Sequence, residues 1–183
     1  MPKIIHIFKT YFPDTQGGLE EAIRQIGKIS IESGFDVSVV SVSKNPLNKY
    51  LDKIKVRSFK KTFDVLSNPF SIDLYTEMPS IIKEADIIHL HFPWPTIELY
   101  TIIKKINKPV MVTFHCDTEK NYILKYFYSF FASKFLQKVD VIVPTSNNLM
   151  NNTKLLKKHL HKCEVIHLWL DESRFKKKLE PSD

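Results

Sequence analysis

Short apolar runs alternate along the chain with segments whose apolar residues recur every three or four positions. The runs are rich in Val and Ile, which is typical of strands buried on both faces of a parallel sheet. They lie at residues 3–9, 36–42, 54–59, 85–91, 110–115, 140–144 and 164–168. The spacing of apolar residues between them predicts helices, at residues 19–33, 72–84, 96–106, 119–137 and 147–158.

This alternation predicts one α/β domain with a single Rossmann-like, doubly wound and mostly parallel sheet of about seven strands. Residues 1–173 are expected to form the domain, and the charged, aperiodic segment 174–183 to be a linker toward a further domain. Local signals mark two helix boundaries. Gly34 suits a left-handed cap that ends the first helix, and Ser146 suits an N-cap for the last.

Composition narrows the class of protein. The chain has 183 residues, 43% of them hydrophobic and 26% charged, which is typical of a folded domain and not of disorder. Its two cysteines lack C-x-x-C spacing, so neither a disulfide framework nor a zinc finger is predicted, and a cytoplasmic location is expected. No signal-peptide pattern and no run of about 18 apolar residues is present.

The charge balance is basic, with a net charge of +7. Lysines concentrate in residues 44–61, 104–138 and 154–178. A basic surface attracts nucleic acid, anionic lipid or a phosphorylated ligand, although a solvated lysine-rich surface is the plain alternative. Because no nucleic-acid recognition motif is present, we expect no nucleic-acid partner.

The loop between the first strand and the first helix ends in Gly17 and Gly18. The chain has only four glycines, and two adjacent ones at a strand–helix junction let a ligand approach the backbone closely. The helix N-terminus behind them suits a phosphate group. The pattern is neither G-x-G-x-x-G nor a P-loop, which disfavours a dinucleotide or flavin domain. An ordinary turn is the alternative.

Four motifs in sequence order resemble the retaining GT-B glycosyltransferases of the group 1, family 4-like class. The first is the Tyr-Phe-Pro to Gly-Gly loop at residues 11–18. Residues 86–95, 108–117 and 140–146 resemble the "D-I-I-H-x-H", "K-P-x-V-x-T-x-H-x-D" and "A-D-x-I-V-x-x-S" strand ends of that class. The His-Phe-Pro-Trp-Pro run at 91–95 is similar to that of bacterial mannosyl- or rhamnosyltransferases.

The resemblance implies a donor side. Gly17 and Gly18 would bind the diphosphate of a nucleotide-sugar, where backbone N–H groups stabilise charge that develops on the leaving group. His115 matches a family histidine near the donor sugar, so it is the candidate catalytic residue, orienting and hydrogen-bonding at the reacting centre. A structural strand-end histidine is the alternative. The resemblance implies no metal and no other cofactor, and no Asp-x-Asp motif is present.

The resemblance also implies an acceptor cleft lined by His91, Phe92, Trp94 and Asp117, where aromatic rings stack on sugars. Packing in the core is the alternative for Trp94. His89 and His91 face the same side of their strand and are potential metal ligands. The sequence shows no third ligand with suitable spacing, so a metal site is not predicted.

In the family, the nucleotide-sugar is held by a C-terminal domain that follows the segment matched by residues 165–175. Here His167 and Trp169 replace the usual Pro and Gly of that segment. The implied function is the acceptor-binding half of a glycosyltransferase that moves a sugar from a nucleotide-sugar to a glycan or lipid-linked acceptor in cell-surface polysaccharide synthesis, inactive alone. The alternative is a non-catalytic binding or membrane-recruiting half of a two-subunit transferase.

A membrane surface is a further candidate partner. The helix predicted at 119–137 combines seven aromatic residues with lysines, a combination that seats helices at the inner face of a membrane. Packing of one aromatic face on the sheet is the alternative.

Overall fold

The computed structural model describes residues 1–116 and 122–168, so Asp117 and the expected linker 174–183 lie outside the described residues. The strands are β1 Lys3–Ile7, β2 Asp36–Ser43, β3 Asn48–Leu51, β4 Ile54–Lys60, β5 Phe63–Val65, β6 Asn68–Phe70, β7 Ile87–Phe92, β8 Val110–Phe114 and β9 Val141–Pro144. The helices are α1 Gly18–Glu32, α2 Ile72–Glu84, α3 Pro95–Ile103, α4 Tyr122–Lys138 and α5 Asn147–Asn152, with short 3-10 helices at Leu156–Lys158 and Leu160–Lys162.

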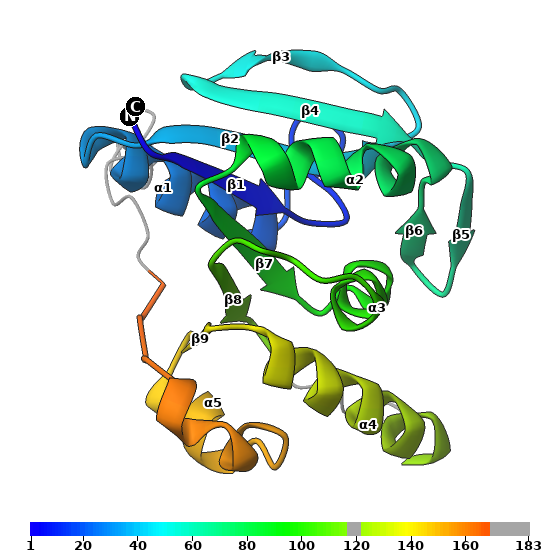
Figure 1. Cartoon of the computed structure of the whole chain (residues 1–183), viewed down its shortest axis with the longest axis vertical. Coiled ribbons are helices and arrows are strands. Elements are labelled where there is room, and N and C mark those ends of the chain that lie inside the picture. The colour runs from blue at the N-terminus through cyan, green and yellow to red at the C-terminus, as the bar shows by residue number, and fades with distance from the viewer. Residues whose placement is uncertain (117–121, 169–183) are drawn as a thin grey trace, which may run out of the picture.

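A seven-stranded sheet in the order β3-β4-β2-β1-β7-β8-β9 forms the centre of the domain (Figure 1). All neighbouring strands are parallel except β3 and β4. The predicted Rossmann-like α/β fold is therefore confirmed. The carboxyl ends of the parallel strands share one edge, which is where ligands bind in open sheets of this class.

Alternate positions of each strand pack on opposite faces of the sheet. Ile5, Ile7 and Ile88 belong to a core shared with α2, α3 and α4. Val39 and Val56 form a second core with Ile23 of α1. His6 lies between Ile5 and Ile7 in the strand, so it faces α1, and this face carries the candidate site.

The predicted helix boundaries are confirmed at two places. Gly34 has a φ of +89°, and the N–H of Phe35 donates to the carbonyl of Ser30 at 3.0 Å, which closes the end of α1. The Ser146 hydroxyl accepts a hydrogen bond from the Leu149 N–H at 3.1 Å, as an N-cap does.

The C-terminal part of the prediction was wrong in two ways. The helix after Ser146 ends at Asn152 and not at Lys158, because Asn and Thr are weak helix formers, and two 3-10 helices follow. Residues 164–168 form no strand. Their backbone runs beside β9, where Glu164 N–H donates to Ile142 at 2.9 Å and Ile166 N–H to Pro144 at 3.2 Å. The seventh strand is instead β3, which the sequence did not predict.

Candidate functional site

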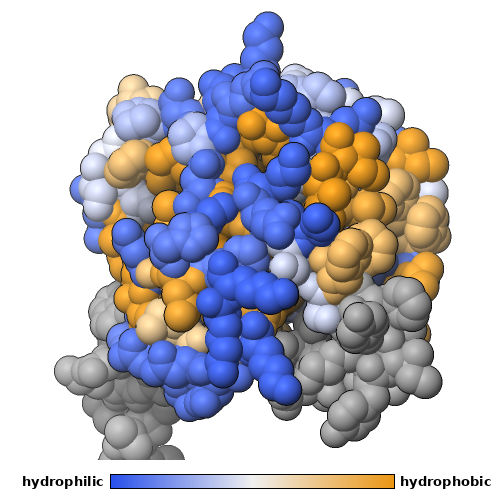
Figure 2. Space-filling view, turned by 60° about the horizontal axis from the view of Figure 1, so that its bottom comes forward, coloured by the Kyte–Doolittle hydropathy of each residue, from blue (hydrophilic) through white to orange (hydrophobic). Residues whose placement is uncertain are grey.

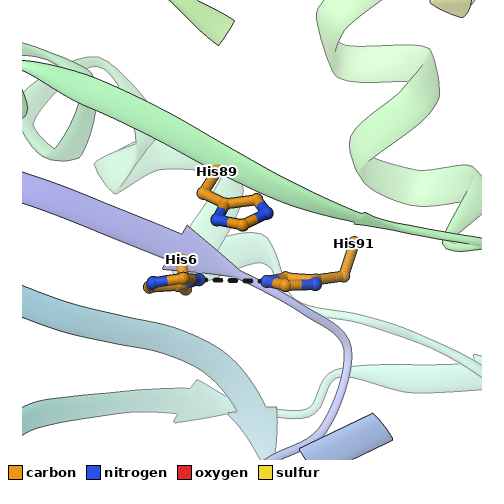
Figure 3. Close-up of side chains that lie close together, drawn as sticks. All are labelled: His6, His89 and His91. Atoms are coloured by element: carbon orange, nitrogen blue, oxygen red, sulfur yellow. Dashed lines mark hydrogen bonds between the residues drawn. The ribbon is translucent and has the colours of Figure 1, made fainter. Parts of the chain in front are cut away.

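Four of the seven histidines lie together on the α1 face of the sheet. β1 supplies His6, β7 supplies His89 and His91, and His115 follows β8; Figure 3 shows the first three. The parallel pairing of β1 with β7 puts His6 opposite His89. Residues 83 positions apart thus become neighbours, which no local sequence pattern indicates.

The four rings contact one another or a strand hydroxyl. His6 Nδ1 lies 3.1 Å from His91 Nε2, and His91 Nδ1 lies 3.1 Å from His115 Nε2. His89 Nε2 lies 2.7 Å from the Thr113 hydroxyl. These contacts extend from the centre of the sheet to the carboxyl end of β8, so they connect the buried histidines to the candidate catalytic residue.

Burial keeps the four histidines uncharged at neutral pH. It lowers the pKa of His6 to about 3 and that of His115 to about 4. Burial, aided by the neighbouring histidines, also lowers the pKa values of His89 and His91 well below 6.5. Each ring therefore carries one N–H donor and one bare nitrogen acceptor at pH 7.

Sequence reasoning missed His6 as a third potential metal ligand beside His89 and His91. The candidate ligand atoms of these three histidines lie within 4.8 Å of one another. Only the strand pairing could have revealed this group, because β1 and β7 are far apart in the chain. The geometry of the rings, described below, favours hydrogen bonds over metal binding.

His91, Phe92 and Trp94 lie in the core and not on a cleft wall. Their exposed fractions are 0%, 1% and 0%. Phe92 stacks on Phe114, and the Trp94 indole N–H donates to the carbonyl of Pro69 at 3.2 Å. The expected direct contact with an acceptor finds no accessible side-chain surface here, because all three side chains are buried. Trp94 packs in the core, as the alternative for it expects.

The glycine loop is organised by a carboxylate. The Gly17 N–H donates to Glu20 Oε2 at 3.1 Å, and the Thr10 and Thr15 hydroxyls donate to Oε1 at 2.7 and 2.6 Å. Burial alone would raise the pKa of Glu20, but hydrogen bonds from Thr15, Thr10 and Gly17 lower it overall. A negative charge therefore lies at the N-terminus of α1, where the resemblance implies a diphosphate.

The two glycines differ in their surroundings. A Cβ atom built on Gly17 would lie 2.6 Å from Glu20 Oε2, whereas one built on Gly18 would meet nothing within 4 Å. The Gly17 N–H is already engaged by Glu20. Of the two, Gly18 is therefore the one beside open space that a ligand can enter.

A cavity of about 560 Å³ lies beside this loop, at the carboxyl ends of β1 and β2. Its lining is mostly polar or charged: Lys9, Thr10, Asp14, Thr15, Val42, Ser43, Lys44, Asn45, Lys61, Asp64, Ser67 and Pro69. Lys61 pairs with Asp64 at 3.0 Å, while Lys44 has no ion pair within the described residues. The sequence indicated a basic segment here but not the cavity.

Residues 16–174 match the model of glycosyltransferase family 4. The chain belongs to this family. It is 30% identical over 177 residues to the D-rhamnosyltransferase WbpZ of Pseudomonas aeruginosa, covering 96% of this chain and 46% of that protein. It is 31% identical over 172 residues to O-antigen chain mannosyltransferase C of Escherichia coli, covering 93% of this chain and 46% of that protein.

The fold of this family 4 chain is also that of solved GT-B structures. Anabaena HepE, solved in complex with UDP and glucose, superposes with a TM-score of 0.61 at 13% identity, covering 94% of this chain and 46% of that one. The resemblance to a GT-B N-terminal domain is thus confirmed. The chain spans about half the length of the curated relatives it matches.

Proposed function

We propose that this family 4 chain is the acceptor-side half of a retaining glycosyltransferase. The enzyme moves a sugar from a nucleotide-sugar to a glycan or lipid-linked acceptor in cell-surface polysaccharide synthesis. The observation that carries the proposal is the family match over residues 16–174, since the two relatives named above are a rhamnosyltransferase and an O-antigen mannosyltransferase. A second domain supplies the nucleotide-sugar site, so this half does not turn over alone.

The cavity beside the glycine loop is the proposed acceptor site. Its size fits a sugar unit, and pockets at the carboxyl edge of such sheets are the usual ligand sites. The hydroxyls of Thr10 and Thr15 donate to Glu20 and keep lone pairs that can accept hydrogen bonds from sugar hydroxyls. Lys44, which has no ion pair among the described residues, suits an anionic group such as the phosphate of a lipid-linked acceptor.

The donor side of the reaction is assigned to Gly17, Gly18 and His115. The open side of Gly18 supports close approach of a diphosphate to the start of α1. Gly17 acts through its hydrogen bond to Glu20, which shapes the loop. His115 hydrogen-bonds at the reacting centre. Backbone donors and the helix terminus stabilise the leaving diphosphate in this scheme, which requires no metal.

A peripheral membrane contact is proposed for α4, on the cytoplasmic face. Phe130 and Phe131 have exposed fractions of 60% and 47%, and the Lys134 ammonium lies 5.7 Å from the Phe130 ring centre. Figure 2 shows hydrophobic residues on both sides of a polar band on one face of the domain. No helix within the described residues is long and apolar enough to span a bilayer, so the contact is with the surface.

The half-site proposal is tested by joining residues 1–168 to the C-terminal half of the Escherichia coli relative. Transfer and release of nucleoside diphosphate are measured with nucleotide-sugars that carry mannose, rhamnose or glucose. The 183-residue chain alone should show neither sugar transfer nor release of nucleoside diphosphate. The joined protein should turn over at least one donor. Turnover by the chain alone contradicts the half-site proposal, and a folded but silent joined protein favours the non-catalytic alternative.

A further inference from the structure

The three rings of His6, His91 and His115 lie end to end. The ring centres of His6 and His91 are 5.3 Å apart, and those of His91 and His115 are 5.4 Å apart. With the facing nitrogens 3.1 Å apart, two ring centres can hardly be farther apart than this. The two nitrogens of each pair therefore point at each other within the planes of their rings. Figure 3 shows this arrangement for His6 and His91. It is the geometry of an N–H···N hydrogen bond.

A metal ion fits this arrangement poorly. An ion midway between His6 Nδ1 and His91 Nε2 would lie at half of 3.1 Å, or about 1.5 Å from each, whereas Zn–N bonds are about 2.0–2.1 Å. His89 does not complete a site, because its ring stacks on His91 with an interplanar angle of 22° and a centre separation of 4.5 Å. Nitrogen lone pairs lie in the ring planes, so two stacked rings do not converge on one ion.

Neutral rings make the two hydrogen bonds depend on each other. His91 has one N–H, so it donates either to His6 or to His115 and accepts from the other. When His91 Nε2 carries the hydrogen, His115 Nε2 must donate to it and His6 Nδ1 must accept. When His91 Nδ1 carries it, both neighbours reverse. The three histidines therefore share one tautomer, all Nε2–H or all Nδ1–H.

We propose that His6 and His91 are positioning residues that fix the tautomer of His115. The two ends of the chain, His6 Nε2 and His115 Nδ1, are buried and have no hydrogen-bond partner within the described residues. An unmet buried polar atom on a candidate catalytic ring lacks the hydrogen-bond partner that a bound substrate hydroxyl would supply. Two hydrogen bonds tie the form of His115 Nδ1, donor or acceptor, to the tautomer of His6 on β1.

This inference rests on the proposed function only for the role of His115 toward substrate. The shared tautomer is a property of the folded chain and is read without donor or acceptor. Failure of the joined protein to transfer sugar therefore refutes the proposed function and leaves the hydrogen-bonded chain intact. Conversely, opposite tautomers of His91 and His115 in a joined protein that transfers sugar refute this inference and leave the proposed function intact.

The test is a long-range ¹H–¹⁵N spectrum of the histidine-labelled 183-residue chain at pH 7, after treatment with a chelator. We expect one dominant tautomer for His6, His91 and His115, and the same one in all three. Opposite tautomers for His115 and His91 overturn the proposal. Stoichiometric binding of added zinc, with loss of the coupled signals of His6 and His91, also overturns it, in favour of a metal site.

Two variants and a control separate positioning from a general structural role. In His91→Phe the link is broken, so both tautomers of His115 should become populated. In His6→Phe the hydrogen bond between His91 and His115 remains, so the two rings should still share a tautomer, but both forms of the pair should become populated. His167→Gln removes an exposed histidine and should leave His115 unchanged. If His115 keeps a single tautomer in a folded His91→Phe, the proposal is overturned, and the wild-type spectrum decides it if that variant does not fold.

Discussion

The Gly17 N–H donates to Glu20 Oε2 at 3.1 Å, which places a carboxylate at the start of α1. Thr10 and Thr15 hold the other oxygen of the same carboxylate. The carboxylate is therefore held in position by donors on both oxygens. The two adjacent glycines form one motif in the sequence, but they differ in the room left for a side chain. Gly17 contacts the Glu20 carboxylate, whereas Gly18 adjoins open space.

The first prediction contrasts the two glycines. Gly17→Ala should lower the free energy of unfolding by about 1–3 kcal/mol, because its Cβ displaces the bound Glu20 carboxylate. Gly18→Ala should be neutral or slightly stabilising, since alanine has room there and favours the helix. Urea unfolding measures both. In a Glu20→Ala background the cost of Gly17→Ala should largely vanish, and equal costs in the two backgrounds contradict the account.

Acid pH should destabilise the chain. The folded pKa values of His6 and His115, about 3 and 4, lie below the ordinary 6.5, so the unfolded state binds more protons as the pH falls. Each should remove about 2 kcal/mol of stability between pH 7 and pH 5, and His89 and His91 act in the same direction. Burial raises the pKa of Glu98 to about 7, so at this residue the folded state binds a proton more readily than the unfolded state. This one group therefore offsets part of the loss of stability between pH 7 and pH 5.

Urea unfolding at pH 7 and pH 5 checks the net effect. The His6→Phe variant serves as the comparison, because it removes one of the buried groups that resist protonation. Its stability should depend less steeply on pH than that of the wild type. A wild-type stability that does not change between the two pH values is inconsistent with four neutral histidines in the folded state.

The fold could be predicted from the sequence where the signal was local. The Val- and Ile-rich runs gave β1, β2, β7, β8 and β9, since strands buried on both faces are continuously apolar. The strand predicted at residues 54–59 is β4, but its partner β3 and the β5–β6 hairpin escaped prediction. Their turns use Asp52-Lys53 and Leu66-Ser67 at positive φ in place of Asn-Gly.

The candidate site was harder to predict than the fold. Motif spacing located His115 at a strand end, but the burial of Phe92 and Trp94 depends on helices that come from elsewhere in the chain. The link from His6 to His115 depends on which strands pair, and no single segment of the sequence indicates the strand order. The cavity beside the glycine loop likewise combines residues from the loop after β1, from β2 and from the β5–β6 hairpin region.

The cavity predicts a binding role for Lys44. Lys44→Ala should weaken binding of a soluble prenyl diphosphate to the chain about ten-fold, because a charge-assisted contact to phosphate is lost. Calorimetry on the 183-residue chain measures the affinity. Lys49→Ala, on exposed β3 and outside the cavity lining, should leave the affinity within two-fold, at about the error of the comparison. Similar losses in both variants indicate a general charge effect and contradict a specific site.

The exposed aromatic pair predicts a surface contact with membranes. Replacing Phe130 and Phe131 with Ser should reduce co-sedimentation with vesicles rich in anionic lipid, because apolar burial and the nearby lysine both contribute to binding. Ile29→Ser on α1 is the control, since its exposed fraction of 47% equals that of Phe131. Retention of vesicle binding by the double variant excludes α4 as the contact.

The central claim, that this half carries a group that acts at the reacting centre, is tested most directly by sugar transfer with His115→Gln. The variant is made in the protein that joins residues 1–168 to the C-terminal half of the Escherichia coli relative. We predict a fall in kcat of about 100-fold, as expected for loss of a positioned hydrogen-bonding group, with the thermal unfolding midpoint within a few degrees of the parent. His161→Gln should transfer at the parent rate. An unchanged kcat for a folded His115→Gln contradicts the account.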